Sequence, residues 1–287
     1  MTLIRRRIDV EFQLNAESFE NTDSNTVRVE GLRVQANITN TDGPALGNAQ
    51  IRIFGLQPSI INQIQGLNRA AQAVRKNKVI IYAGDDVAGM PIVFKGTISL
   101  AQADMTNPPD ISLTVVAYAG YFEALKTAAS TSYPGSADAA IIMSDFAARM
   151  GLGFEGPNGV SVILPTPHYH GSLRDQAQSC ADAAKIAWTI EEEKLVIWDR
   201  KVGRGGAIPL ISPETGLVGY PSYSSGQFEG LAVTSIFNSL LRIGKKARIE
   251  SALKVANGTW GIYNLMHSIE SETPNGKWFT QFNGSPF

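Results

Sequence analysis

The chain has 287 residues, of which 44% are hydrophobic and 18% are charged, with 27 glycines and 14 prolines. This length can hold two or three domains, and the composition is typical of a folded, turn-rich protein and excludes a disordered one. The net charge of −1 excludes the large basic excess of proteins that bind nucleic acid tightly. The single cysteine, Cys180, excludes an internal disulfide framework and gives no evidence of export.

The sequence gives no sign of a targeting or membrane segment. The N-terminal residues contain no apolar run long enough for a signal peptide. No stretch approaches the roughly 20 apolar residues that a membrane-spanning helix needs. We therefore expect no membrane insertion and a protein that is made in a cytoplasm.

The first 120 residues are predicted to be mainly β. Alternating apolar residues predict three strands, over Ile4–Leu14, Thr26–Thr39 and Ala49–Leu56. The second of these changes phase near Gly31, which predicts a β-bulge. A hairpin is predicted around the turn Gly84-Asp85-Asp86, with strands over Val79–Ala83 and Ile92–Leu100. One further strand is predicted over Ile111–Ala119.

One helix interrupts these strands. Pro58 suits the first turn of a helix, which is predicted to continue to about Ala73. Apolar residues recur along it at helical spacing, at Ile60, Ile61, Ile64, Leu67 and Ala71. Seven elements, mostly β with one helix, predict a small closed or nearly closed barrel.

The middle of the chain is predicted to be a separate α+β unit. Ser136 is a candidate cap for a helix that runs to Met150 and is stopped by Gly151. Its apolar stripe comprises Ala139, Ile142, Met143, Phe146, Ala147 and Met150. A second helix is predicted from Ser172 to about Ile186, followed by a hairpin of Trp188–Ile190 and Leu195–Asp199.

The C-terminal part is again predicted to be extended. Four strands are expected, over Ser239–Ile243, Ala247–Leu253, Thr259–His267 and Lys277–Phe282. In the third, Trp260, Ile262, Asn264 and Met266 share one face, whereas Gly261, Tyr263, Leu265 and His267 share the other. Asn275-Gly276 supplies the positive φ of a hairpin turn. About 60 residues are few for a barrel, so we expect Leu217–Ala232 to contribute strands.

These patterns resemble a family, the baseplate hub proteins of contractile-tailed bacteriophages, of the phage late control or tail protein D type. In the last hairpin, the strand ends in His267, an acidic tip follows, and Trp278-Phe279-Thr280 precedes Gly284-Ser285-Pro286. Near the start, IRIFGLQPSIINQI, VIIYAGDD and IVFKGTIS resemble the first tail-tube-like domain of that family. The resemblance covers nearly the whole chain.

The resemblance implies a mainly β, α+β fold, with two tail-tube-like β-barrel domains and a small α+β domain between them. The expected domains are 1–122, 123–215 and 216–287. It further implies a structural virion protein of the tail baseplate, assembled in the host cytoplasm. The expected assembly is a homotrimer whose pseudo-sixfold ring joins a hexameric tail tube to a trimeric central spike. Tube-initiator, tape-measure and other baseplate proteins are further expected partners, and DNA would pass through the lumen without specific binding.

Several motifs have the residue types of chemical sites. Gly151–Gly156 spells GxGxxG, but it follows a predicted helix and leads to a strand, so it is interpreted as a turn. His168 and His170 lack a third ligand for zinc, because His267 lies in another predicted domain. Cys180 lies on a helical apolar stripe and is expected to be buried. The sequence thus predicts no catalytic, cofactor-binding or metal-binding residue.

The charged clusters also have structural interpretations. The acidic groups Asp85-Asp86, Glu191–Glu193 and Glu270/Glu272 lie on predicted hairpin tips, where solvated charge is expected. Arg204 lies in a glycine-rich turn. The basic runs Arg5-Arg6-Arg7 and Lys245-Lys246 are interpreted as solvated strand ends and a turn, or as residues at subunit contacts or near a channel.

Two alternatives from other functional classes remain. The first is a cell-wall (peptidoglycan) hydrolase that works through paired carboxylates. The second is a carbohydrate-binding tail module that uses exposed aromatic residues such as Tyr220, Tyr223 and Trp278. The structural interpretation is favoured because the predicted acidic clusters lack a desolvated cleft.

Overall fold

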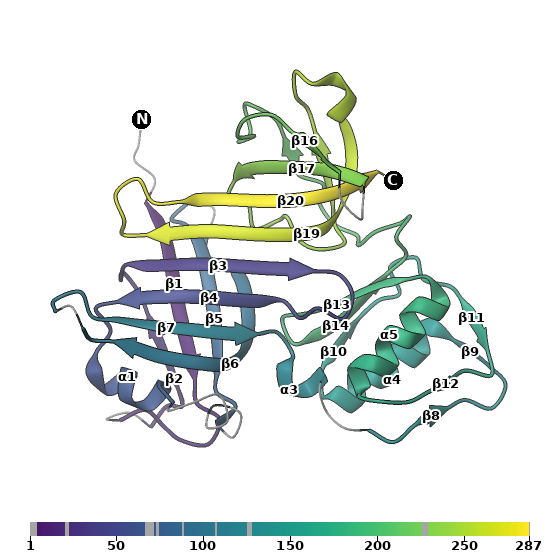
Figure 1. Ribbon diagram of the computed structural model, residues 1–287, viewed down its shortest axis with the longest axis horizontal. Helices are drawn as coiled ribbons and strands as arrows, with labels where there is room; N and C mark the ends of the chain where they lie inside the picture. The colour runs from purple at the N-terminus through teal and green to yellow at the C-terminus, as the bar shows by residue number, and fades with distance from the viewer. Residues whose placement is uncertain are drawn as a thin grey trace. The chain divides into compact units, whose positions relative to one another are not determined.

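The computed structural model describes residues 5–20, 23–66, 72, 75–87, 89–106, 108–124, 128–225 and 229–286. The chain divides into two compact units (Figure 1). The first comprises Met1–Thr39, Asn48–Ala119 and His267–Phe279, and the second comprises Asn40–Gly47, Gly120–Met266 and Thr280–Phe287. Strands outnumber helices in the described chain, so the predicted mainly β, α+β class is confirmed.

The first unit is built on one antiparallel sheet. Its strands are β1 (Arg6–Gln13), β2 (Thr26–Val29), β3 (Val34–Thr41), β4 (Asn48–Phe54), β5 (Lys78–Asp85), β6 (Ile92–Asp104) and β7 (Ser112–Tyr118). They lie in the order β3-β4-β7-β6-β5-β1-β2, and β19 (Gly258–Ser271) pairs with β3 at the other end. Figure 1 shows β3, β4, β7 and β6 side by side.

Alternation that is clear along β3, β4 and β7 and less regular along β1, β5 and β6 places one face of the sheet in the core. In the β1–β5 pair, Val10 lies opposite Ile81 and Phe12 opposite Val79, and all four side chains are buried. Because directly opposed residues share a face, these pairs form one continuous apolar layer. The other face carries mostly polar side chains.

The predicted second strand is in fact two strands. β2 ends at Val29 and pairs with β1, whereas β3 begins at Val34 and pairs with β4. Gly31, with φ of 69°, lies in the turn between them. The phase change therefore marks a chain turn and not the expected bulge, because the backbone of β2 forms its hydrogen bonds with β1 and that of β3 forms them with β4.

Helix α1 (Pro58–Ile64) is shorter than predicted. Ile61 and Ile64 are buried, as the helical spacing predicts, but Gln65 is already extended. The amide of Gly66 donates instead to the carbonyl of Ala101 in β6, at 3.3 Å, so the chain has left the helix at this point. The predicted positions Leu67, Ala71 and Ala73 lie outside the described residues.

The second unit contains the two predicted helices of the middle segment. Its first elements are α3 (Tyr121–Ala124), β8 (Thr131–Ser132), β9 (Ser136–Asp138), α4 (Ala139–Met150), β10 (Gly153–Glu155), β11 (Ile163–Pro165), β12 (His168–Tyr169), α5 (Leu173–Ala184), β13 (Ala187–Glu191) and β14 (Lys194–Trp198). Helices α4 and α5 lie side by side (Figure 1), and β10-β14-β13 form a small sheet.

The predicted apolar stripe of α4 is confirmed, because all six of its residues are buried. Gly151 ends the helix with φ of 80°, also as predicted. The cap, however, is Asp138 and not Ser136: the Asp138 side chain accepts from the amide of Ala140. Ser136 belongs to β9 and pairs with Pro165 of β11.

The remaining elements of the second unit form an extended sheet. They are β15 (Leu210–Ile211), β16 (Ser222–Ser225), β17 (Glu229–Ile236), β18 (Lys246–Ile249), the short helix η1 (Lys254–Ala256), β19 and β20 (Trp278–Pro286). The order is β16-β17-β20-β19, and β19 also pairs with β18, which pairs with β15. The segment Leu217–Ala232 thus contributes β16 and part of β17, as predicted.

Two predictions for this region are wrong. Ser239–Ile243 lies in a pair of turns. In the first, the amide of Leu241 donates to the carbonyl of Asn238, and in the second, the amide of Lys245 donates to the carbonyl of Arg242. Leu241 and Ile243 are nevertheless buried, so turn residues fill the core positions that the pattern assigned to a strand. In β19 the alternation changes phase, because Trp260, Ile262 and Leu265 all lie in one apolar cluster with Phe282.

Candidate functional site

The three consecutive arginines at the start of β1 each have a specific partner in the first unit. The Arg5 guanidinium donates to Glu272 from Nη2 at 2.6 Å and from Nε at 2.9 Å. The Arg6 guanidinium lies 5.7 Å from the centre of the Trp278 ring. Arg5 and Arg6 therefore hold the tip of the β19–β20 hairpin, which the interpretation as solvated strand ends did not predict.

Arg7 belongs to a charged cluster around Asp9, whose side chain has no exposed surface. Oδ2 of Asp9 accepts from Arg28 at 2.7 Å and from Arg7 at 3.3 Å. The hydrogen bond to Asp9 raises the pKa of Arg28, and Asp9 is also the main cause of the raised pKa of Arg7. Glu30 pairs with both guanidinium groups. The cluster fastens the short strand β2 to β1.

A second charged network lies inside the second unit and is centred on Arg204. Its side chain is only 5% exposed, and its guanidinium pairs with Glu191 at 2.7 Å and with Glu155 at 2.9 Å. Nη1 also donates to the carbonyl of Ile243. Arg204 therefore joins β10, the end of β13 and the turn before β18, although the sequence suggested only a glycine-rich turn.

The network continues to the turn that carries Arg242 and Lys245. Arg242 pairs with Glu191 at 3.3 Å and with Glu192 at 2.6 Å. Burial opposes the charge on Arg242, but the two glutamates outweigh it and raise its pKa. The pKa of Lys245 is lowered by burial and then by Arg204 and Arg242. The expectation that the Glu191–Glu193 tip is simply solvated is therefore wrong for Glu191 and Glu192.

The three histidines do not converge on one site. His168 lies in β12, where Nδ1 is 2.5 Å from Oγ of Ser132, and His170 is exposed two residues later. His267 is buried in the first unit. In the part of the chain that the structure describes, no group of three or more His, Cys, Asp or Glu side chains is placed to hold a metal ion.

Cys180 is fully buried in α5, as predicted. Burial raises the pKa of its thiol to about 11. A thiol whose pKa is about 11 and not 9.0 contains about a hundredfold less of the reactive thiolate at about pH 8. We therefore expect an aromatic disulfide reagent to leave Cys180 unlabelled at this pH until the protein is unfolded.

The same shift predicts how stability depends on pH. The unfolded thiol loses its proton near its ordinary pKa of 9.0, whereas the folded thiol keeps it to about 11. The folded state binds more protons in this window, so the free energy of unfolding should fall as pH rises from 9, by roughly 2–3 kcal/mol. Urea unfolding at several alkaline pH values, with Cys180→Ala as control, would measure it. An equal fall in the control would contradict the assignment.

Other predicted motifs have structural roles. Gly151 and Leu152 form the turn after α4, but Gly153–Glu155 is strand β10, so the interpretation of Gly151–Gly156 as a turn is correct only for its first two residues. Tyr220 and Tyr223 are exposed, but Trp278 is buried, so it does not offer the exposed ring that sugar binding needs. Asp86 is mostly exposed but pairs with Arg7 at 3.4 Å.

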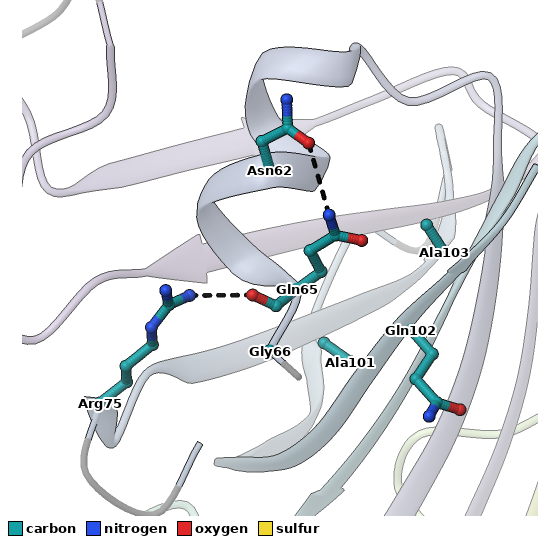
Figure 2. A pocket seen from close by; sticks show the side chains of 7 residues that line it. All are labelled: Asn62, Gln65, Gly66, Arg75, Ala101, Gln102 and Ala103. Atoms are coloured by element: carbon teal, nitrogen blue, oxygen red, sulfur yellow. Dashed lines mark hydrogen bonds between the residues drawn. The ribbon is translucent and has the colours of Figure 1, made fainter. Parts of the chain in front are cut away.

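An open pocket of about 530 Å³ lies beside α1 in the first unit (Figure 2). Its lining comes from the end of α1 (Asn62, Gln65), from Arg75, and from residues 101–103 of β6. The Arg75 guanidinium donates to the carbonyls of Gln63 and Gln65 at 3.0 and 2.9 Å. The sequence gave no signal for this pocket, because helix and strand are far apart in the chain.

None of the helices in the described ranges is both long enough and apolar enough to cross a membrane.

Solved structures with this fold are tail proteins and their relatives. A tail protein from Neisseria meningitidis MC58 superposes with a TM-score of 0.64 at 8% identity, over 97% of this chain and 96% of that one. The 43 kDa tail protein of prophage MuSo2 from Shewanella oneidensis gives 0.59 at 9% identity, over 96% of both chains. The E. coli c3393 protein, a component of the type VI secretion system, gives 0.61 at 11% identity, over 96% and 76%.

The fold is thus one that phage tail proteins share with a type VI secretion component. The chain belongs to the baseplate hub gp41 family, whose model matches residues 7–281. No curated protein sequence matches it. The family match confirms the predicted resemblance to baseplate hubs and identifies a structural component of the phage tail.

Proposed function

We propose that the protein is a hub protomer that assembles as a homotrimer in the virion baseplate. Three chains, each with two tail-tube-like domains, would form a ring with six similar positions. Such a ring would match a hexameric tail tube on one side and a trimeric central spike on the other. The observation that carries this proposal is that a chain of the baseplate hub family has strands β1–β7 before its helical middle segment and strands β16–β20 after it.

The proposed division of the chain is 1–122 and 216–287 for the two tube-like barrels and 123–215 for the α+β domain. Strands β1–β7 and strands β16–β20 support the two barrels, and α4 with α5 supports the α+β domain. The E. coli c3393 protein is described as structurally similar to the T4 tail proteins gp27 and gp5. This likeness supports tube-side and spike-side partners, with tube-initiator, tape-measure and other baseplate proteins as further neighbours.

We infer a structural and not a catalytic role. The family is one of baseplate hubs, and the strongest charged clusters of the described residues are ion-paired with arginine. The net charge of −1 suits a ring whose lumen passes DNA without holding it. Assembly would take place in the host cytoplasm before the finished tail enters the virion.

The native mass of the purified protein across a wide dilution series tests the proposal. We expect a species of three times the 30.9 kDa monomer mass that survives dilution. Electron microscopy along its axis should then show threefold symmetry with six similar lobes. A monomer at every concentration, both alone and co-produced with the spike protein, would overturn the trimer.

A further inference from the structure

Strand β6 extends beyond its neighbour β5 and leaves one edge open. The last pair between them joins Lys78 to Thr97, but β6 continues to Asp104 along β7. Residues 99–104 therefore have a strand partner on one side only in the described chain. The pocket beside α1 lies at this edge (Figure 2).

The register tells which backbone groups point into the pocket. The carbonyl of Ala101 accepts from Gly66, so Ala101 directs its polar groups away from β7. Successive residues of a strand direct these groups to opposite sides, so the N–H and C=O of Ala103 also point away from β7. Among described residues, no backbone hydrogen bond joins Ala103 to a chain on that side. An extended polypeptide pairs with such groups.

The lining combines polar side chains with the small residues Gly66, Ala101 and Ala103. Asn62 and Gln65 project from the end of α1, and Arg75 lies across from the strand (Figure 2). Arg75 is the one charged residue among the described lining residues, and no carboxylate lies with it. Its two bonds to the carbonyls of Gln63 and Gln65 both use Nη1 and hold the guanidinium at the pocket.

We propose that this open edge of β6 receives an extended, acidic segment of a partner protein by strand addition. The segment pairs with the backbone of Ala103, and one of its carboxylates binds Arg75. A single cation is too little for a nucleic acid backbone, which needs several phosphate contacts. The pocket is also open, and its apolar side chains, Ala101 and Ala103, are small, so it lacks the hydrophobic and aromatic walls that enclose a small molecule. Each chain carries the site by itself, so the proposal does not rest on the homotrimer.

The test measures fluorescence anisotropy of two labelled hexapeptides of alternating threonine and valine, one with a central glutamate and one with glutamine. We expect the glutamate peptide to bind the full chain saturably. Arg75→Gln should weaken that binding roughly tenfold, because a charge-assisted hydrogen bond is lost. The glutamine peptide should bind the unaltered chain as weakly as the glutamate peptide binds the Arg75→Gln variant. Arg75→Gln should not change the binding of the glutamine peptide.

Ala103→Pro removes the N–H that the added strand would use. Proline is tolerated at an open strand edge, so the melting temperature should stay unchanged while binding of both peptides is lost. If this variant does not fold, hydrogen exchange of the Ala103 amide in the unaltered chain replaces it. Slower exchange on adding the glutamate peptide supports the proposal, and unchanged exchange overturns it.

Three other outcomes overturn the proposal. They are the absence of saturable binding, binding that Ala103→Pro leaves intact, and equal affinity for the two peptides. A concentration-dependent dimer that Ala103→Pro abolishes would show that a second copy of this chain occupies the edge, which also overturns it. Because peptide binding needs one chain only, its failure is distinguishable from failure of the trimer.

Discussion

Replacement of Arg204 by alanine is expected to lower the free energy of unfolding of the second unit by about 3–5 kcal/mol. The Arg204 side chain is 5% exposed and that of its partner Glu191 is 15% exposed. Removing the arginine leaves Glu155 without this ion pair and Glu191 with Arg242 alone, at 3.3 Å, and it also strips the carbonyl of Ile243 of a donor. Urea unfolding followed by tryptophan fluorescence would measure the loss, because Trp188 and Trp198 lie in this unit.

A matched control is available in the same unit. Arg248 pairs with Glu250 at 2.8 Å, but the two side chains are 63% and 45% exposed. An exposed pair contributes little, so Arg248→Ala should cost less than about 1 kcal/mol. Equal losses for the two variants would contradict a special role for the buried network.

Replacement of Phe146 by alanine is the second change with a large expected effect. Phe146 has no exposed surface in α4, and its ring meets Tyr169 edge to face with centres 5.8 Å apart. Truncation removes the ring and leaves a cavity between α4 and its neighbours, which should cost about 3–5 kcal/mol. Hydrogen exchange should rise through α4 and α5 together, because the two helices contact each other.

Ile141 provides the control for this change on the same helix. Its side chain is 66% exposed, so Ile141→Ala should change stability by no more than about 0.5 kcal/mol. If Ile141→Ala were as costly as Phe146→Ala, burial of the ring would not explain the loss, and helix propensity would not either, because alanine favours the helix more than isoleucine or phenylalanine. That outcome would reject the cavity argument.

Local patterns predicted those elements whose stability depends on neighbours in sequence. The stripe of α4 was correct at every position because helical spacing and burial coincide there. Ser172 was correctly expected at the start of α5, where it forms a capping box with Asp175. The terminal hairpin was also found, although its turn uses positive φ at Asn275 and not at Gly276.

Features that depend on distant partners were missed. Nothing near Arg204 in sequence shows that Glu155, 49 residues away, will meet it. The turns at 239–243 were taken for a strand, because alternating apolar residues do not distinguish a strand from a turn that packs Leu241 and Ile243 inward. The division of the strand at Gly31 was not predicted. The two halves pair with different strands, β1 and β4, and this pairing is a property of the folded sheet.

By itself, the sequence determined the mainly β, α+β class, the positions of the two central helices, the burial of Cys180 and the resemblance to baseplate hubs. These follow from periodicity, capping and motif order, which are short-range properties of the chain. Only the tertiary structure decided that Arg5, Arg7 and Arg204 are ion-paired, where β19 changes phase, and that among the described residues no strand pairs with the edge of β6 beside Arg75. These depend on which segments pack together, because desolvation and charge pairing are set by neighbours in space and not by neighbours in sequence.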